Sequence, residues 1–171
     1  MNNLNRELKK EGKRICIVDV DGTLIDASRR FRVATKRGRV DWKVALDIRN
    51  IEILDKPMPK HIIDKIKNIC RDICNEIIIL TGRPENLKDI TIRQIKNIDF
   101  KYDKLIMRNV GDYSNEVDFK IRKILEISKF GNICAIFDDN LEFLKHVKNL
   151  LHNVKIFYVT YDDVYELVEL F

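Results

Sequence analysis

Short apolar runs alternate with amphipathic stretches along the chain. The apolar runs have the length of strands and lie at 15–18, 76–80, 104–107, 133–137 and 154–159. Continuous runs of this kind are typical of strands buried on both faces of a parallel sheet. Helical spacing is found between and after them, at 41–54 (in part), 60–73, 85–97, 117–130, 141–151 and 163–171. This alternation predicts an α/β fold, a Rossmann-like three-layer sandwich with a five-stranded, mainly parallel sheet.

Polar residues whose side chains could bind ligands or take part in catalysis follow four of these runs. In chain order they are Asp19 and Asp21, Thr81, Arg108, and Asp138 and Asp139. Because the carboxyl ends of parallel strands meet at one edge of a sheet, we expect these side chains to share a crevice. A single Asp-x-Asp pair would be more typical of a solvated loop. Its recurrence as paired acids after a second buried run favours a common site.

Carboxylates gathered in one crevice form an oxygen-ligand site for a hard cation. The candidate ligands are Asp19, Asp21, Asp138 and Asp139. An open octahedral site that leaves room for phosphate oxygens suits Mg²⁺, whereas zinc favours His or Cys. A carboxylate can also attack phosphorus to give an aspartyl-phosphate when cations screen the repulsion. Lys120 could supply such a charge, and Thr81 a hydroxyl in front of a helix N-terminus.

Four ordered segments resemble the haloacid dehalogenase superfamily of aspartate-nucleophile phosphatases. They are IVDVDGTL at 17–24, ILTGR at 79–83, Lys120, and IFDDN at 136–140. The resemblance extends from about residue 14 to residue 160. It implies that Asp19 is the nucleophile and Asp21 the general acid/base, while Thr81 and Lys120 orient and neutralise the phosphoryl group. It also implies a Mg²⁺ site formed by Asp19, the backbone carbonyl of Asp21, and Asp139 with Asp138 beside it.

The intervals between these motifs are too short for a full cap domain. Among uncapped members, the stretch 104–120, the TGRPEN turn at 81–86 and the spacing from Arg37 to Asp41 are similar to the 3′-phosphatase domain of phage-type polynucleotide kinase/phosphatase. Two positions depart from that subgroup, because Asn140 replaces a typical Arg and Glu116 a shorter Asp. The expected substrate-binding residues are Gly82, Arg83, Arg37, Arg39 and Arg108.

A basic segment at 24–40 separates the first motif from the rest, and we expect a loop or hairpin flap there. It carries Arg29, Arg30, Arg32, Lys36, Arg37 and Arg39, in a chain of formal charge +5 and pI near 9.0. Such a flap could grip a polynucleotide backbone, and the alternative is an ordinary solvated surface. We expect a polar tail at 1–13 followed by a single domain at 14–171.

Three functions are compatible with these features. The first is a Mg²⁺-dependent phosphatase that removes 3′-phosphates from nucleic-acid ends. The second is the same chemistry on a small metabolite or mononucleotide, and the third is a non-catalytic module that binds nucleic acid. No G-x-x-x-x-G-K-[ST] phosphate loop occurs in the 171 residues, so no kinase activity of that type is expected.

The chain lacks an N-terminal apolar segment and any run of membrane-spanning length, so we expect a cytoplasmic protein with no membrane partner. Its four cysteines include no C-x-x-C pair and no cluster of metal-binding spacing. Cys16 and Cys134 lie in expected strands, and Cys70 and Cys74 in an expected helix. We interpret them as buried structural thiols, and whether Cys16 and Cys134 pair stays open.

Overall fold

The computed structural model describes residues 12–168. The polar tail expected at 1–13 therefore falls almost entirely outside the described residues. Within them, no helix is both long and apolar enough to cross a membrane.

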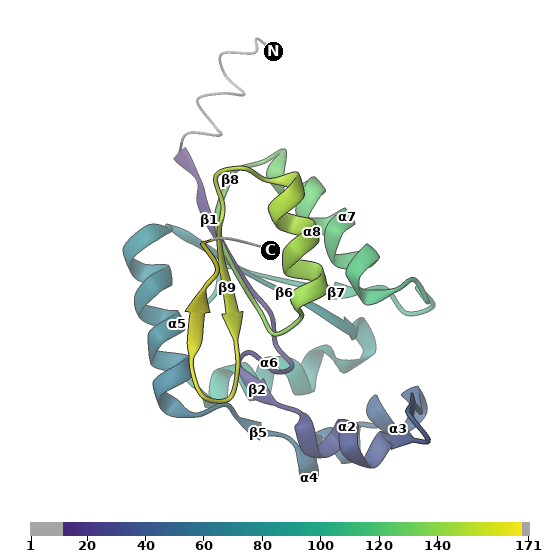
Figure 1. Ribbon diagram of the computed structural model, residues 1–171. Coiled ribbons are helices and arrows are strands. Elements are labelled where there is room, and N and C mark those ends of the chain that lie inside the picture. The colour runs from purple at the N-terminus through teal and green to yellow at the C-terminus, as the bar shows by residue number, and fades with distance from the viewer. Residues whose placement is uncertain (1–11, 169–171) are drawn as a thin grey trace.

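A six-stranded sheet forms the centre of the molecule, in the order β10-β9-β8-β1-β6-β7 (Figure 1). Its strands are β1 (Arg14–Val18), β6 (Glu76–Pro84), β7 (Lys104–Arg108), β8 (Asn132–Asp138), β9 (Lys155–Val159) and β10 (Val164–Glu166). All neighbouring pairs are parallel except β9 and β10. The five predicted strands are thus confirmed, and β1 lies between β8 and β6, where both faces are covered.

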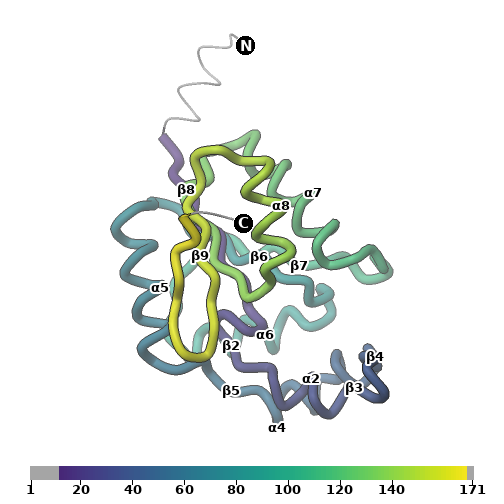
Figure 2. Tube along the Cα trace, in the orientation of Figure 1, coloured from purple at the N-terminus to yellow at the C-terminus, as the bar shows by residue number. Residues whose placement is uncertain are grey.

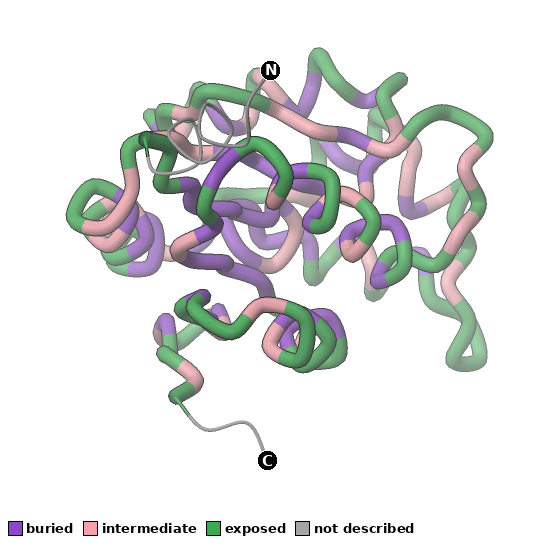
Figure 3. The backbone as a smooth tube through the Cα atoms, turned by 90° about the horizontal axis from the view of Figure 1, so that it is seen from above, coloured by how far each residue is buried: buried purple, intermediate pink, exposed green. Residues whose placement is uncertain are grey.

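Helices cover both faces of this sheet, which confirms the three-layer sandwich. They are α5 (Lys60–Ile73) and α6 (Lys88–Asn97) on one face, and α7 (Glu116–Ser128) and α8 (Leu141–Leu150) on the other. The side chains of β1 alternate between the two layers: Cys16 and Val18 join the core under α5, and Ile15 and Ile17 join the core under α7 and α8. Burial is therefore concentrated in the middle of the molecule (Figure 3).

The segment between β1 and α5 is a small subdomain beyond the carboxyl edge of the sheet (Figure 2). It contains β2 (Ile25–Asp26), α2 (Ser28–Ala34), β3 (Thr35–Lys36), β4 (Arg39–Val40), α3 (Trp42–Ala45), α4 (Ile48–Leu54) and β5 (Lys56–Pro57). These short elements are too small for a full cap domain. The expected hairpin is present, since β3 and β4 pair antiparallel. A two-residue turn joins them, and Arg37 and Gly38 have the positive φ angles that such a turn requires, 50° and 75°.

Much of the basic flap is helical, contrary to the expected loop. Helix α2 forms although no side chain caps its N-terminus. It is stabilised by tertiary contacts, because Arg30 and Ala34 lie one turn apart on the buried face while the neighbouring cations point outward.

The prediction of a helix at 163–171 is wrong for residues 163–168, the part of this segment that the structure describes. Residues 164–166 form β10, which returns antiparallel to β9 after a tight turn in which the Thr160 N–H donates to the Asp163 carbonyl oxygen at 2.9 Å. Val164 is buried in the core, whereas Tyr165 and Glu166 are exposed. Residues 169–171 lie outside the described range.

Three of the four cysteines form a cluster that the sequence spacing did not indicate. The sulfur atoms of Cys16, Cys70 and Cys74 lie within 4.8 Å of one another, because α5 packs its last turn against β1. Cys134 is not paired with Cys16, whose neighbour on β8 is Ala135. All four cysteines are free thiols.

Candidate active site

An acidic cluster lies where β1 and β8 end side by side. The register pairs Val18 with Phe137, and the Asp19 N–H donates to the Phe137 carbonyl oxygen at 3.0 Å. The chain segments that follow bring carboxylate oxygens of Asp19, Asp138 and Asp139 within 4.8 Å of one another. Asp19 and Asp138 are buried and Asp139 is exposed to the crevice. Three of the four predicted metal ligands therefore meet at the predicted sheet edge.

Lys120 joins this cluster from helix α7. Its Nζ donates to Asp19 Oδ1 at 2.9 Å and to Asp138 Oδ2 at 2.8 Å, and it lies 3.2 Å from Glu116 Oε1. The side chain is 2% exposed and its ammonium group lies 5.4 Å from the centre of the Phe143 ring. Lys120 is thus a fixed positive charge beside the candidate nucleophile, as predicted.

The acids of this cluster raise one another's pKa. Burial, and then the charge of Asp138, raises the pKa of Asp19 well above its ordinary value, against the lowering effect of Lys120. Much of the Asp139 surface is open to solvent, yet the desolvation of its carboxylate and the nearby Asp138 raise its pKa to about 7. Burial alone would lower the pKa of Lys120, but Asp138 and Asp19 outweigh it and raise that pKa well above its ordinary value. The cluster lacks positive charge, since one ammonium group faces several carboxylates.

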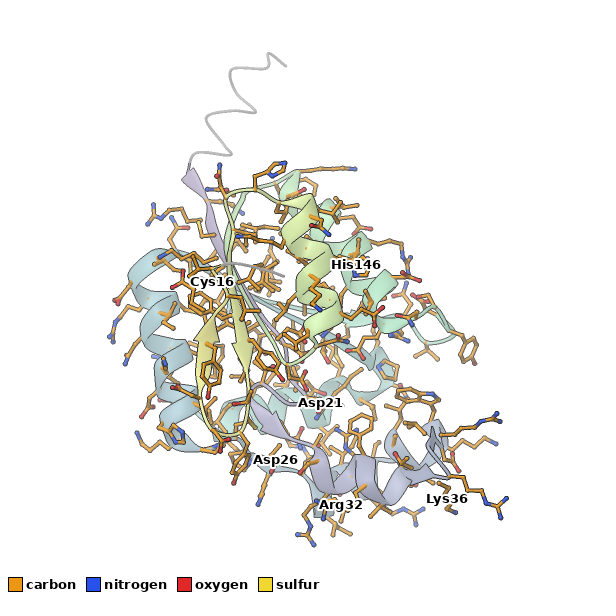
Figure 4. All side chains as sticks on the ribbon, in the orientation of Figure 1. Cys16, Asp21, Asp26, Arg32, Lys36 and His146 are labelled. Atoms are coloured by element: carbon orange, nitrogen blue, oxygen red, sulfur yellow. The ribbon has the colours of Figure 1, made fainter. Side chains whose placement is uncertain are left out.

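This donor set fits a hard divalent cation. Its three closely spaced carboxylates offer the oxygen ligands that Mg²⁺ prefers, and an added positive charge would relieve the repulsion that raises their pKa values. The trio of thiols, in contrast, lies along β1 and α5, away from these carboxylates. Figure 4 shows Cys16 partway along β1, away from Asp21.

Two glycines allow carboxylates to approach the backbone of the site. Gly22 has φ +80°, and a Cβ on it would lie 2.1 Å from Asp139 Oδ2. A Cβ on Gly82 would lie 2.9 Å from the Glu116 side chain. Side chains at these positions would therefore displace acids of the site.

Asp21 belongs to a second group of charges beside the first. Its Oδ1 accepts from Arg83 Nη2 at 2.6 Å and from Arg30 Nη2 at 2.8 Å, and its Oδ2 accepts from Arg83 Nε at 3.0 Å. Both guanidinium groups also contact Asp55, whose side chain is fully buried. Burial would raise the pKa of Asp21, but Arg83 and then Arg30 outweigh it and hold the pKa at about 2. In this arrangement Asp21 is an ionised acceptor two residues from Asp19.

Arg83 does not face the crevice as a free substrate ligand, since its guanidinium group is almost fully buried against Asp21 and Asp55. Thr81 is buried at the same sheet edge, and its Oγ1 accepts from the Arg83 N–H at 3.2 Å. The prediction of a helix N-terminus directly after Thr81 is wrong. Strand β6 continues through Pro84, a 3-10 turn follows at Glu85–Leu87, and α6 begins only at Lys88.

The remaining arginines predicted to bind substrate lie farther out. Arg108 is half-buried, with Nη1 donating to the Ser114 carbonyl oxygen at 3.1 Å and the guanidinium group 5.3 Å from the Phe119 ring centre. Its Nε is buried without a hydrogen-bond partner among the described residues. Arg37 and Arg39 are exposed on the β3–β4 hairpin. This hairpin follows the C-terminal end of α2, the end of the helix that is farther from Asp21 in the sequence. Whether these residues contact a substrate stays a prediction.

Sequence reasoning missed two participants. Asp55 lies alone between α4 and β5, with no motif around it, and Gln94 accepts from Arg83 Nη1 at 2.7 Å. Arg30 is one of the flap cations in the sequence, and its helical phase with Ala34 is the one signal of an inward orientation.

The fold is that of the haloacid dehalogenase-like hydrolases, as the motifs indicate. A solved structure of a haloacid dehalogenase-like family hydrolase from Streptococcus pneumoniae superimposes with a TM-score of 0.56 at 13% identity, over 89% of this chain and 87% of that one. Two structures of a Pnkp1/Rnl/Hen1 complex, one described as an RNA repair complex, contain a similar chain. Their TM-scores are 0.62 and 0.60, with 21% and 20% identity over 87% of this chain.

The chain spans less than half of those two longer relatives, 46% and 43% of their lengths. No protein-family model matches the sequence, and no curated protein matches it either. At these identities the similarities establish the fold, and the activity has to be argued from the site.

Proposed function

We propose that the protein is a Mg²⁺-dependent phosphomonoesterase that works through an aspartyl-phosphate on Asp19 and removes 3′-phosphates from nucleic-acid ends. The observation that carries the proposal is the buried Asp19 carboxylate, held 2.9 Å from Lys120 and within 4.8 Å of Asp138 and Asp139. A nucleophilic carboxylate that meets an anionic phosphate needs this arrangement of fixed positive charge and cation ligands.

In the first step a carboxylate oxygen of Asp19 bonds to phosphorus while the bond from phosphorus to the leaving oxygen breaks. Lys120 holds the Asp19 carboxylate in place and offsets the charge of the phosphoryl group. The leaving oxygen takes a proton from Asp21, which can carry one only when Arg30 and Arg83 loosen their hold on it.

In the second step the oxygen of water bonds to the phosphorus of phospho-Asp19 and its proton passes to Asp21, while the bond from phosphorus to the Asp19 oxygen breaks; this releases inorganic phosphate and restores the Asp19 carboxylate. The low pKa of Asp21 keeps it ionised between the two steps, and it can hold the proton from water only when Arg30 and Arg83 again loosen their hold on it. Asp19, Asp138 and Asp139 would hold the metal, and bound Mg²⁺ would neutralise and orient the phosphate oxygens.

Exposed cations support a nucleic-acid substrate. Arg29, Arg32, Lys36, Arg37 and Arg39 are exposed, and none forms an ion pair with a carboxylate in the described part of the chain. The RNA repair complex among the structural neighbours is consistent with this class of substrate. A small phosphorylated metabolite is the second candidate, because the crevice next to Asp21 and Asp139 is large enough for one.

The Asp19→Asn variant tests the proposal. It keeps the size of the side chain and removes the nucleophile, so hydrolysis of a 3′-phosphorylated oligonucleotide should fall by at least ~10³-fold with the thermal transition nearly unchanged. Trapping of radioactive phosphate on the wild-type protein, but not on the variant, would identify the intermediate. A variant that keeps a tenth of the wild-type rate would remove Asp19 from this role.

A further inference from the structure

A cavity of about 550 Å³ opens beside the catalytic carboxylates. Asp21, Gly22 and Asp139 are among the residues that line it, so it adjoins the place where the leaving group of a phosphate on Asp19 would depart. Its walls come from β2 and α2 on one side and from the segment joining β9 to β10 on the other. The cavity is therefore formed by the fold itself without a cap domain.

Aromatic and apolar side chains form much of its lining. Phe31 projects from α2, and Tyr158 and Tyr161 lie at the end of β9 and in the turn after it. Phe31 and Tyr158 are half-buried, whereas Tyr161 is 54% exposed and available for a ligand. Flat rings at the rim of a polar crevice favour a ligand with an aromatic plane.

The polar groups of the lining are hydrogen-bond acceptors or hydroxyls. They include the carboxylate of Asp26 and the hydroxyl groups of Ser28 and Thr160. Among the described residues that line the cavity there is no Lys and no Arg. A second phosphate would be disfavoured here by Asp26, whose Oδ2 lies 3.9 Å from Lys56 Nζ, whereas a neutral group that carries N–H or O–H donors would be accepted.

We propose that this cavity binds the terminal nucleoside of the 3′-phosphorylated end, with its base stacked on Tyr161 and Phe31. The inference rests on the proposed function and specifies the leaving group. At such an end the nucleoside is neutral, has an aromatic base and offers the N–H groups of that base, and in RNA its 2′-hydroxyl, as donors, so it matches each property of the lining.

The charge distribution around α2 fits the same placement. Asp26, just before the helix, lies on the side of the cavity, and Arg32 and Lys36 extend from the helix and the β3 strand into solvent (Figure 4). The nucleoside would thus enter an anionic cavity while the phosphates of the preceding nucleotides meet the exposed cations.

Two substrates with secondary-alcohol leaving groups test the proposal. Adenosine 3′-monophosphate carries a base, and glycerol 2-phosphate does not. Tyr161→Ala should raise KM for adenosine 3′-monophosphate by about 5- to 150-fold, the range expected for loss of one base–aromatic stack, with little change in kcat. Hydrolysis of glycerol 2-phosphate should be unchanged.

Control variants separate stacking from other effects. Tyr161→Phe should keep the wild-type KM because it keeps the ring. Tyr113→Ala removes a tyrosine that is 95% exposed outside the cavity and should change neither substrate. Phe31→Leu should also raise KM for adenosine 3′-monophosphate. This variant removes a second contact as well, because the ring centres of Phe31 and Trp42 lie 6.3 Å apart in an edge-to-face arrangement.

An unchanged KM in Tyr161→Ala and Phe31→Leu would place the base elsewhere and overturn the inference while the phosphatase proposal stands. Equal losses on both substrates would also overturn it. Should the wild type hydrolyse no phosphomonoester, the proposed function fails. Fluorescence of 2-aminopurine riboside 3′-monophosphate then decides alone: quenching that Tyr161→Ala abolishes supports the cavity, and no quenching overturns it.

Discussion

Three buried cations hold the acids of the site in place at the scale of single residues. Lys120 bridges Asp19 and Asp138, and Arg30 and Arg83 both bridge Asp21 and Asp55. Each is surrounded by acids that would otherwise repel one another. A buried ion pair contributes little net stability, but removing one partner leaves an uncompensated charge in a place where water cannot solvate it.

We therefore expect Arg30→Leu to destabilise the protein by roughly 3 kcal/mol, near the lower end of the range for broken buried pairs because Arg83 still contacts Asp55. Urea unfolding followed by circular dichroism would measure the loss. Arg29→Leu is the matched control, since it removes a neighbouring exposed cation of the same helix and should stay within about 0.5 kcal/mol of wild type. Equal effects of the two variants would contradict the anchoring role of Arg30.

The acidic cluster is predictable from the sequence because its members follow buried strands. The position of a residue at the end of a parallel strand fixes where its side chain lies, so the grouping of Asp19, Asp138 and Asp139 follows from the strand pattern alone. The partners of Asp21 do not, because Asp55 and Arg30 meet only when α2 and the α4–β5 connection pack together. The cluster of Cys16 with Cys70 could not be predicted for the same reason, because the positions of two cysteines in the sequence do not show how a helix packs against a strand.

At the scale of elements, long buried strands and amphipathic helices were predicted well and short elements were not. The helical phase that predicted 163–171 rests on few residues, and in β10 only Val164 is buried. A short segment cannot show whether its apolar residues repeat with the period of a helix or of a strand. The flap has the same difficulty, because tertiary contacts rather than local preference make α2 helical.

The β3–β4 hairpin carries the testable prediction at this scale. Arg37→Ala combined with Arg39→Ala should raise KM for a 3′-phosphorylated single strand and reduce the salt slope of log K by about 0.7 for each lost phosphate contact. Hydrolysis of glycerol 2-phosphate should not change, because the hairpin lies away from Asp19.

Arg71→Ala combined with Lys129→Ala provides a control of equal charge change. Both residues are exposed near the C-terminal ends of α5 and α7, at the opposite edge of the sheet. This control should leave the oligonucleotide KM and its salt dependence unchanged. A matching loss in the control would show that overall charge, and no particular contact, attracts the polynucleotide.

At the scale of the whole molecule, we expect the acidic crevice to link stability to pH and, in the proposed function, to Mg²⁺. Without a cation, burial and Asp138 raise the pKa of Asp139 to about 7, above the ordinary value of about 3.9 for an unfolded chain. The folded state then holds its proton more tightly, so this group's contribution is fully present below about pH 4 and is lost as pH rises toward about 7.

The proposed Mg²⁺ would bind the ionised carboxylates, so we expect its stabilising effect to grow over the same interval. Thermal unfolding with EDTA and with saturating Mg²⁺ at pH 5 and pH 8 would measure it, and the rise in Tm should be larger at pH 8. Asp139→Asn should reduce the difference. An equal rise in Tm at both pH values in the wild type would show that these carboxylates do not couple the ion to folding.

Helix α2 has one face buried against the site and one face in solvent, and this difference matters for protein engineering. Its inward side chain, Arg30, is committed to the acids beneath it, while Arg29, Arg32 and Val33 project into solvent. In the proposed function, we expect random replacement of those three outward positions to change which phosphorylated substrate is favoured, while the buried acids keep their positions. The helix is therefore a natural place to diversify in a selection for altered specificity, with Arg30 held fixed.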